Sequence, residues 1–301
     1  MGKKLNVIYG ALNITIHPHD HKGKVYVNLF KFLARKAIRV RGQDFIYMYG
    51  LTPLNERDIS QGFQGTFVKC TKIELDGFFD TKTDDFTEIQ DIEDLIPDGT
   101  FANARTFNFI FFPSKHLLVT EIKDKDGSVT INTLAKFFEL AFSFKEVIDK
   151  FENLNVYILP DPEKVEALIK MKNIVSMELE ITRPNPDHLN DVESRLHNKM
   201  KRMNVDKIEE TYISSTKQFI EPDEETKNKM RVAAKNGKVE VKAIDMNGKR
   251  KVYSTEAIPF TIQDEYDSKT ESKIDLLKRT AQKIFAKFNA TKGKIDDSKA
   301  D

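Results

Sequence analysis

The order of apolar and polar positions along the chain predicts short strands interspersed with amphipathic helices. In the first half, runs of apolar, aromatic and β-branched residues predict strands over 7–16, 44–49, 65–73, 107–112 and 117–122. Apolar residues that recur every three to four positions predict helices over 28–37 and 133–151. Pro113 to His116 separates the last two strands and predicts a hairpin.

The second half begins with a strand, a helix and a strand, and so predicts a β-α-β unit. These elements are expected over 155–159, 163–172 and 175–182. A helix over 191–203 follows, and then a hairpin whose strands, 238–244 and 250–254, are joined at Asn247-Gly248. A C-terminal helix is expected over 268–288.

Because strands and helices are mixed without regular alternation, the pattern predicts an α+β fold. We expect a mixed or antiparallel sheet with packed helices in an N-terminal domain, residues 1–152. A smaller C-terminal α+β domain, residues 153–290, contains the β-α-β unit and ends in the long helix. Residues 291–301 are expected to be a disordered tail.

The C-terminal helix carries apolar residues at alternating three- and four-residue steps. They are Ile274, Leu277, Ala281, Ile284 and Phe288. Such a seam suits either docking on the body of the protein or pairing with a second copy. We assign it to oligomerisation and expect a homo-oligomer.

Composition narrows the class of protein. The chain has 301 residues, no tryptophan and a single cysteine, Cys70, which sits in a predicted strand and is interpreted as a small buried apolar residue. No apolar run approaches the roughly 20 residues needed to span a bilayer, and the N-terminus lacks a signal peptide, so we expect a cytoplasmic protein without membrane insertion. Nucleotide-binding glycine motifs are absent, and no cofactor is expected.

Charge is distributed unevenly along the chain. Residues 1–50 hold nine Lys and Arg against two Asp and Glu, a balance of +7, whereas residues 51–100 hold four against twelve, a balance of −8. Basic clusters attract phosphates. The candidate nucleic-acid-binding residues are Lys31, Arg35, Lys36, Arg39, Arg41, Lys201 and Arg202. The acidic stretch 74–98 is expected to cover that surface or to bind a basic partner, a second copy included.

Three histidines, His17, His19 and His21, surround Asp20 and form a weak candidate metal site, because imidazole and carboxylate are zinc or nickel ligands. Their spacing suits one ion only in an extended segment, and an exposed loop is the favoured interpretation.

A second pattern is typical of metal-dependent nucleases. Asp98 follows a proline, and Glu121 and Lys123 end a strand downstream, as in the PD-(D/E)xK nucleases. In that chemistry the carboxylates hold a divalent ion and the lysine assists the attack of water. The motif is short, and one extra strand is predicted between Asp98 and Glu121.

Several segments resemble a large bacterial family found beside mobile elements and phage-defence genes. They are residues 65–73, residues 107–121 and Arg183 to Asp187. The layout, with a helix headed by Val27-Asn28-Leu29, is distantly similar to the RexA-type phage-exclusion proteins and to the DNA-binding subunit of the Kiwa defence system. The resemblance implies a non-enzymatic, oligomeric protein that binds DNA with little sequence preference in phage defence.

Together these features favour a non-enzymatic nucleic-acid-binding protein, with double-stranded DNA as the expected ligand. Two alternatives stay open. One is the PD-(D/E)xK-like nuclease, with Asp98, Glu121 and Lys123 as its catalytic residues. The other is an interaction subunit of a defence complex, which binds the product of a neighbouring gene.

Overall fold

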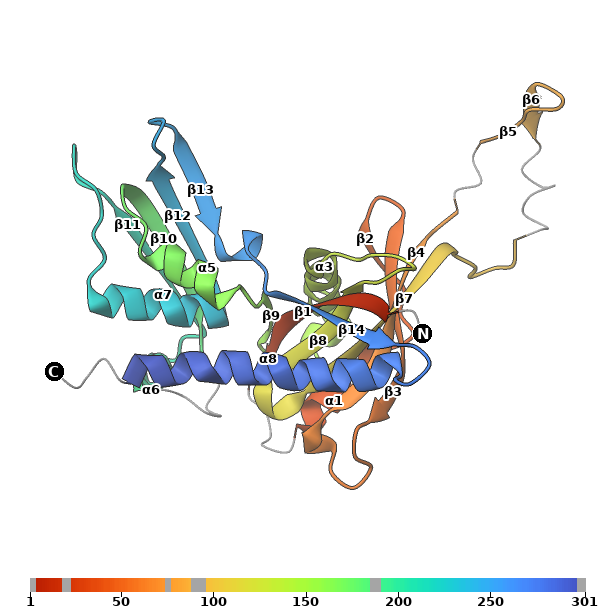
Figure 1. The fold of residues 1–301 in the computed structure, drawn as a ribbon, viewed down its shortest axis with the longest axis horizontal. Coiled ribbons are helices and arrows are strands. Elements are labelled where there is room, and N and C mark those ends of the chain that lie inside the picture. Colours follow the sequence, from red (N-terminus) through yellow and green to blue (C-terminus); the bar gives the residue numbers. More distant parts are fainter. Residues whose placement is uncertain (1–3, 18–22, 74–76, 88–95, 185–190, 297–301) are drawn as a thin grey trace.

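The computed structural model describes residues 4–17, 23–73, 77–87, 96–184 and 191–296. It confirms the predicted α+β class. The chain forms two main sheets, each with helices packed against it (Figure 1).

The larger sheet is antiparallel and runs in the order β14-β1-β8-β7-β4-β3-β2, with β9 pairing the end of β1 beyond β14. Its strands are β1 (Lys4–Ile16), β2 (Ile38–Arg41), β3 (Asp44–Pro53), β4 (Phe63–Thr71), β7 (Ala102–Phe112), β8 (Leu117–Lys123), β9 (Leu154–Ile158) and β14 (Thr261–Asp267). Their β-branched and aromatic residues suit a pleated surface buried on one or both sides.

Helices α1 (Lys24–Leu33), α3 (Ile131–Phe142) and α4 (Lys145–Ile148) contribute to one face of this sheet. The core beneath them is built from phenylalanines, with Phe30 and Phe138 stacked among Phe67, Phe109 and Phe111. A chain without tryptophan therefore obtains its aromatic core from Phe.

Helix α8 (Lys273–Asp296) crosses the opposite face, over β14, β8 and β7. Leu277, Ala281 and Ile284 of α8 are fully buried in a second cluster with Val7, Tyr9 and other apolar residues of the sheet. The helix thus docks on the body of its own chain.

The smaller sheet is antiparallel, in the order β11-β10-β12-β13. It comprises β10 (Ile174–Thr182), β11 (Lys207–Ile213), β12 (Gly237–Ile244) and β13 (Arg250–Ser254). Apolar residues of α5 (Pro162–Ile169), α6 (Asp191–Met203) and α7 (Glu224–Asn236) form one core with it. Short 3-10 helices η1 (Ile59–Gln61), η2 (Pro113–Lys115) and η3 (Thr255–Ala257) complete the connections.

The sheets divide the chain differently from the expected boundary near residue 152. Strand β9 pairs with β1, and β14 returns to β1 from the far end of the chain. The smaller unit, about 161–258, is therefore inserted into the larger one. The strand-helix-strand order at 154–182 is present, but β9 and β10 belong to different sheets, so it is not a parallel β-α-β unit.

Several elements differ from the sequence pattern. Helix α1 ends at Leu33 because Ala34 is extended and Arg35 has a positive φ of 65°, so the predicted stretch to residue 37 is not helical. The helix expected over 133–151 is broken near Ser143 into α3 and α4. At the C-terminus, residues 291–296 continue α8 instead of forming a tail, and 297–301 lie outside the described residues.

A small hairpin, β5 (Phe78–Asp80) and β6 (Asp85–Thr87), forms an arm that stands apart from both sheets (Figure 1). It belongs to the acidic stretch. In the described part of the chain, no helix is long and apolar enough to cross a membrane.

Candidate nucleic-acid interface

The face of the large sheet that carries α8 is covered over only part of its width. Residues that pair directly across antiparallel strands project to the same side of a sheet. Arg39 pairs with Phe45, Tyr47 with Val68, and Tyr49 with Thr66. The row of paired residues that contains Tyr49 and Thr66 continues across the sheet to Asn108 and then to Tyr9. Because Tyr9 lies beneath α8, these residues project to the side of the sheet that α8 covers.

Beyond the edge of α8, no helix of the described residues covers this side of the sheet. Tyr49 is 41% exposed, and Arg39 and Thr106 are also exposed, while Phe45 and Tyr47 are partly buried. The rings of Tyr47 and Tyr49 lie next to each other with centroids 6.2 Å apart. We call Phe45, Tyr47, Tyr49 and Arg39, together with Arg41 at the β2–β3 turn beyond a register shift, the aromatic–basic face.

The two arginines of this face are exposed, and neither pairs with a carboxylate among the described residues. The Nε of Arg39 donates a hydrogen bond to the carbonyl oxygen of Gly42, which holds the side chain at the β2–β3 turn. Arg41 lies at the same turn, opposite Asp44. Asp44 forms its own ion pair with Lys69, at 3.3 Å. The guanidinium groups of Arg39 and Arg41 are thus available to an external anion.

A row of polar side chains leads from the open face to the part beneath α8. The Thr66 hydroxyl donates to Oδ1 of Asn108 at 3.2 Å. The Asn108 Nδ2 and backbone N–H donate to the two carboxylate oxygens of Glu121, each at 3.1 Å. This row fixes the amide of Asn108 and links the exposed half of the face to a buried acid.

Glu121 is fully buried. Burial raises the pKa of its carboxyl, while the two hydrogen bonds from Asn108 and the charge of Lys273 partly oppose that rise. Lys273 also binds Asp124, so α8 contributes its first residue to this cluster. The Tyr9 hydroxyl lies nearby and is buried without a hydrogen-bond partner among the described residues. Burial, and secondly the charge of Glu121, raises the pKa of Tyr9.

The candidate nuclease residues are not brought together. Asp98 lies in an exposed turn before β7. Glu121 is hydrogen-bonded to Asn108, which lies six residues beyond Ala102, the first residue of β7. Six strand residues span roughly 20 Å. Lys123 is exposed at the end of β8. Among the described residues, no group of three or more His, Cys, Asp or Glu could hold a metal ion. Asp98 and Glu121 are therefore not placed together as a pair of metal ligands.

The predicted histidine site is described only in part. His17 is buried at the end of β1, and His19, Asp20 and His21 lie outside the described residues. A further imidazole outside the predicted site, that of His116, is also buried, and its Nδ1 is hydrogen-bonded to the Tyr26 hydroxyl.

The predicted basic patch is divided between different surfaces. Arg39 and Arg41 border the aromatic–basic face, but Lys31 lies on α1, whose core is on the opposite side of the sheet. Arg35 follows α1, and Lys36 pairs with Glu146 of α4 at 3.1 Å. Lys201 and Arg202 are exposed on α6 in the smaller unit.

The residues assigned to oligomerisation are largely used within the chain. Leu277, Ala281 and Ile284 are fully buried against the body, and Ile274 is partly buried. The side chain of Phe288 lies outside the described residues. The apolar seam was correctly recognised, but the surface it binds is the chain's own second face, because only folding brings β1, β8 and β14 together beneath it.

Cys70 is buried in β4, as predicted, and its Sγ contacts the carbonyl oxygen of Phe45 at 3.8 Å. Burial raises the pKa of its thiol, which makes it a poor nucleophile.

Tyr47 and Tyr49 were the residues that sequence analysis missed. Their signal was the alternation within 44–49, where Ile46 and Met48 face the core and the tyrosines face the other side.

Comparison with known proteins adds a family but no activity. A family model described as a domain of unknown function, DUF4747, matches residues 5–282, which include nearly all of both sheets and the buried Leu277 and Ala281 of α8. No curated protein matches the chain.

Proposed function

The chain belongs to the DUF4747 family, and from the chemistry of its aromatic–basic face we propose that it is a non-enzymatic protein that binds single-stranded nucleic acid with little sequence preference. The single observation that carries the proposal is the open half of the large sheet, where two adjacent tyrosines are bordered by two arginines without carboxylate partners among the described residues.

Single strands suit this chemistry better than a duplex. In a duplex the flat faces of the bases are occupied by their neighbours, whereas unpaired bases stack on aromatic side chains. Each such stack is worth about 1–3 kcal/mol and tolerates any base, because every base has a flat face. Arg39 and Arg41 supply the charge that phosphates require. Double-stranded DNA, the ligand expected from the charge pattern alone, becomes the comparison in the test.

The geometry of the site favours binding over catalysis. Glu121 accepts hydrogen bonds from Asn108 and is fully buried, so its carboxylate does not face the open surface. The Cys70 thiol is buried as well. A face of aromatic rings and guanidinium groups suits reversible association.

The test is a binding titration by fluorescence anisotropy, with labelled mixed-sequence DNA as a single strand and as a duplex of equal length. We expect tighter binding to the single strand. Replacing Tyr47 and Tyr49 together by Ala should weaken it at least tenfold, since two stacks are lost. Phe219→Ala removes a similarly exposed ring from the smaller unit and should leave affinity unchanged. Equal losses in both variants, or none in the tyrosine variant, would contradict the proposal.

Salt dependence separates the arginines from the tyrosines. For single strands, the slope of log affinity against log salt is about −0.7 for each phosphate neutralised. Arg39→Gln with Arg41→Gln should make the slope less steep by roughly 1.4, whereas the tyrosine variant should keep the slope and lose affinity uniformly. Arg202→Gln, on α6, is the matched control for lost surface charge.

We extend the proposal to a cytoplasmic role in phage defence on the resemblance in sequence layout alone. Its test is plaque formation by a panel of phages on cells that carry the wild-type gene or the tyrosine double variant. Protection by the wild type and its loss in the variant are expected. Equal plaque numbers with the wild type and with no gene would remove the defence role and leave the binding proposal intact.

A further inference from the structure

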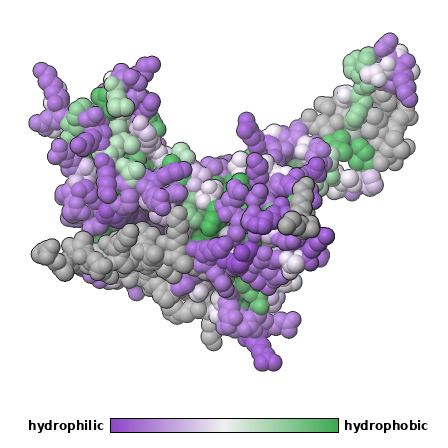
Figure 2. All heavy atoms as spheres, in the orientation of Figure 1, coloured by the Kyte–Doolittle hydropathy of each residue, from purple (hydrophilic) through white to green (hydrophobic). Residues whose placement is uncertain are grey.

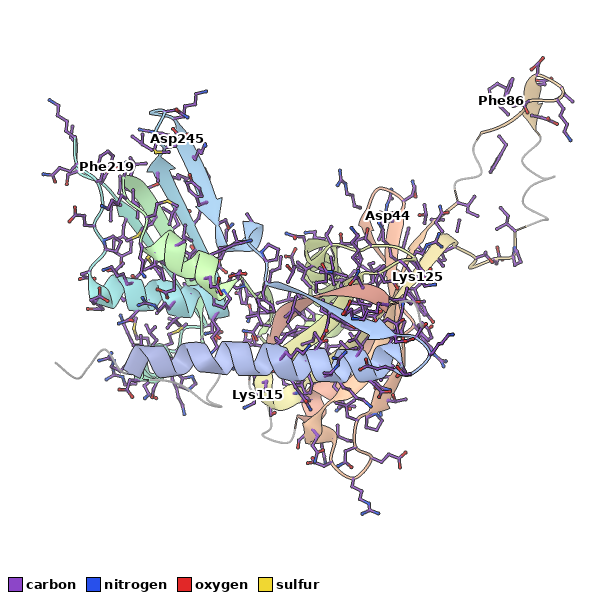
Figure 3. The ribbon with its side chains drawn as sticks, in the orientation of Figure 1. Asp44, Phe86, Lys115, Lys125, Phe219 and Asp245 are labelled. Carbon is purple, nitrogen blue, oxygen red and sulfur yellow. The ribbon has the colours of Figure 1, made fainter. Side chains whose placement is uncertain are left out.

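The hairpin β5–β6 stands apart from both sheets (Figure 1), and it carries two exposed aromatic rings. Phe79 is 53% and Phe86 75% exposed, and their ring centroids lie 5.6 Å apart in an edge-to-face arrangement. Figure 3 places Phe86 on this arm, far from the labelled residues of both sheets. Exposed aromatic pairs of this kind are typical of binding hot spots and not of solvated loops.

Carboxylates surround these rings. Asp80, Asp84 and Asp85 are the acidic residues of 77–87, against a single base, Lys82. Asp84 and Asp85 are exposed, and none of the three pairs with a cation among the described residues. Green apolar atoms and purple polar atoms lie side by side on the arm in Figure 2. The hairpin therefore presents flat rings and anionic oxygens together, the same two groups that a nucleic-acid strand presents.

The aromatic–basic face is the complementary surface within this sequence. Its tyrosines offer rings to the two phenylalanines, and Arg39 and Arg41 offer charges to the aspartates. The hairpin stands apart from both sheets of its own chain (Figure 1). It thus leaves the face of its own chain open, as the exposure of Tyr49 shows. A second copy provides the same face to this hairpin.

We propose that the hairpin of residues 77–87 docks on the aromatic–basic face of a second copy of this chain. Two copies related by a twofold axis would each donate one hairpin and each receive one, which closes the assembly as a dimer. The docked hairpin occupies the surface that the proposed function assigns to nucleic acid, so this part of the inference rests on that function: dimer formation and nucleic-acid binding compete.

The first experiment is sedimentation velocity at low salt over a protein concentration series. The wild type should shift from monomer to dimer, and Phe79→Ser with Phe86→Ser should stay monomeric throughout. Phe219→Ser is the matched control and should dimerise like the wild type, and thermal melting should show that all three chains fold. A wild type that is monomeric at every concentration, or a hairpin variant that dimerises equally well, would overturn the docking.

A charge exchange tests the identity of the two surfaces. Copies with Arg39→Asp and Arg41→Asp, and copies with Asp84→Arg and Asp85→Arg, should each be monomeric alone. Their equimolar mixture should form a dimer, because the new aspartates then meet the new arginines. A mixture that remains monomeric would overturn the pairing of these surfaces.

Competition is measured separately with labelled single-stranded DNA. At concentrations where the wild type is dimeric, the hairpin variant should bind the strand more tightly. Unchanged affinity in a variant that has become monomeric would overturn the competition. A hairpin-dependent dimer in a chain that binds no DNA at all would overturn the proposed function and leave the docking established.

Discussion

Asn108 donates two hydrogen bonds to Glu121, one from its side-chain amide and one from its backbone nitrogen, and so holds a carboxylate inside the large sheet. A buried carboxylate costs free energy unless its oxygens are satisfied. Asn108 also accepts from Thr66, which connects the acid to the open face. Four testable consequences concern this cluster and the elements around it.

The first prediction concerns the pH dependence of Glu121. Its pKa is raised in the folded protein by burial, so the folded state binds this proton more tightly than the unfolded state does. The contribution of Glu121 to the free energy of unfolding is therefore greatest at low pH. It is lost as pH rises from the unfolded value, about 4.3, through the folded pKa. Glu121→Gln should gain stability relative to the wild type between about pH 4 and pH 7 in urea titrations.

Asp264 serves as a control, because its pKa is shifted in the opposite direction from that of Glu121. Burial acts to raise the pKa of its carboxyl, but hydrogen bonds from Lys283 and Thr280, at 2.5 and 2.9 Å, outweigh burial and hold the pKa below its usual value. Its stabilisation is present above the unfolded pKa and is lost as pH falls. Asp264→Asn should therefore lose stability relative to the wild type over the same rise in pH. The same slope in both variants would contradict the assignment.

The second prediction compares two buried tyrosines. The Tyr9 hydroxyl has no hydrogen-bond partner among the described residues, whereas the Tyr26 hydroxyl is bonded to His116 and to the backbone N–H of Ile16. A buried, unsatisfied polar group costs about 1–3 kcal/mol. Tyr9→Phe should raise the free energy of unfolding by about 1 kcal/mol, and Tyr26→Phe should lower it by a similar amount. Destabilisation by both substitutions would show that Tyr9 has a partner.

The third prediction tests the docking of α8. Leu277 is fully buried against the body, so Leu277→Ala should cost about 2–5 kcal/mol, the range for cavities left in a core. Because the contact is within one chain, the loss of melting temperature should be the same at every protein concentration. Lys278→Ala, one residue further along an exposed part of the helix, is the control. A loss of melting temperature that becomes smaller as the protein concentration rises would indicate that this apolar seam joins two copies of the chain.

The fourth prediction concerns the junction between α7 and β12. A Cβ on Gly237 would lie 1.9 Å from the carbonyl oxygen of Glu180 in the neighbouring strand. Gly237→Ala should therefore displace β12 from β10 and destabilise the smaller unit by several kcal/mol. Gly77→Ala is the matched control, since nothing lies within 4 Å of its Cβ position and its melting curve should be unchanged. Equal melting curves would contradict this close packing.

Sequence patterns located most elements of the fold, because strands such as β1 and β8 are dense in apolar and β-branched residues. Helix α7 was missed because its buried Met230, Val232, Ala233 and Ala234 are set among lysines, arginine and glutamates. Two of those charges are paired inside the unit, Arg231 with Glu166 and Lys229 with Glu210. Ion pairs between distant residues cannot be seen in a linear charge count.

The candidate site was less predictable than the fold. The charge pattern did identify Arg39 and Arg41, but grouped them with Lys31 and Lys201 because neighbours in sequence need not share a surface. The tyrosines of β3 can be recognised as exposed binding residues only once the structure shows that α8 does not cover them. Likewise, the match of Asp98, Glu121 and Lys123 to a nuclease motif could not show that one member is exposed in a turn and another is fully buried.

The return of β14 to β1 also sets the order in which the protein can be completed during synthesis. Residues 261–284 form the last contacts of the large sheet, yet they leave the ribosome after the whole inserted unit. Until then, the edge of β1 and the apolar surface around Tyr9 and Ile110 remain open. At about 5–20 residues per second, the intervening 161–258 segment delays closure by roughly 5–20 seconds. Nascent chains of this protein therefore pass through a stage in which this apolar surface is exposed to solvent.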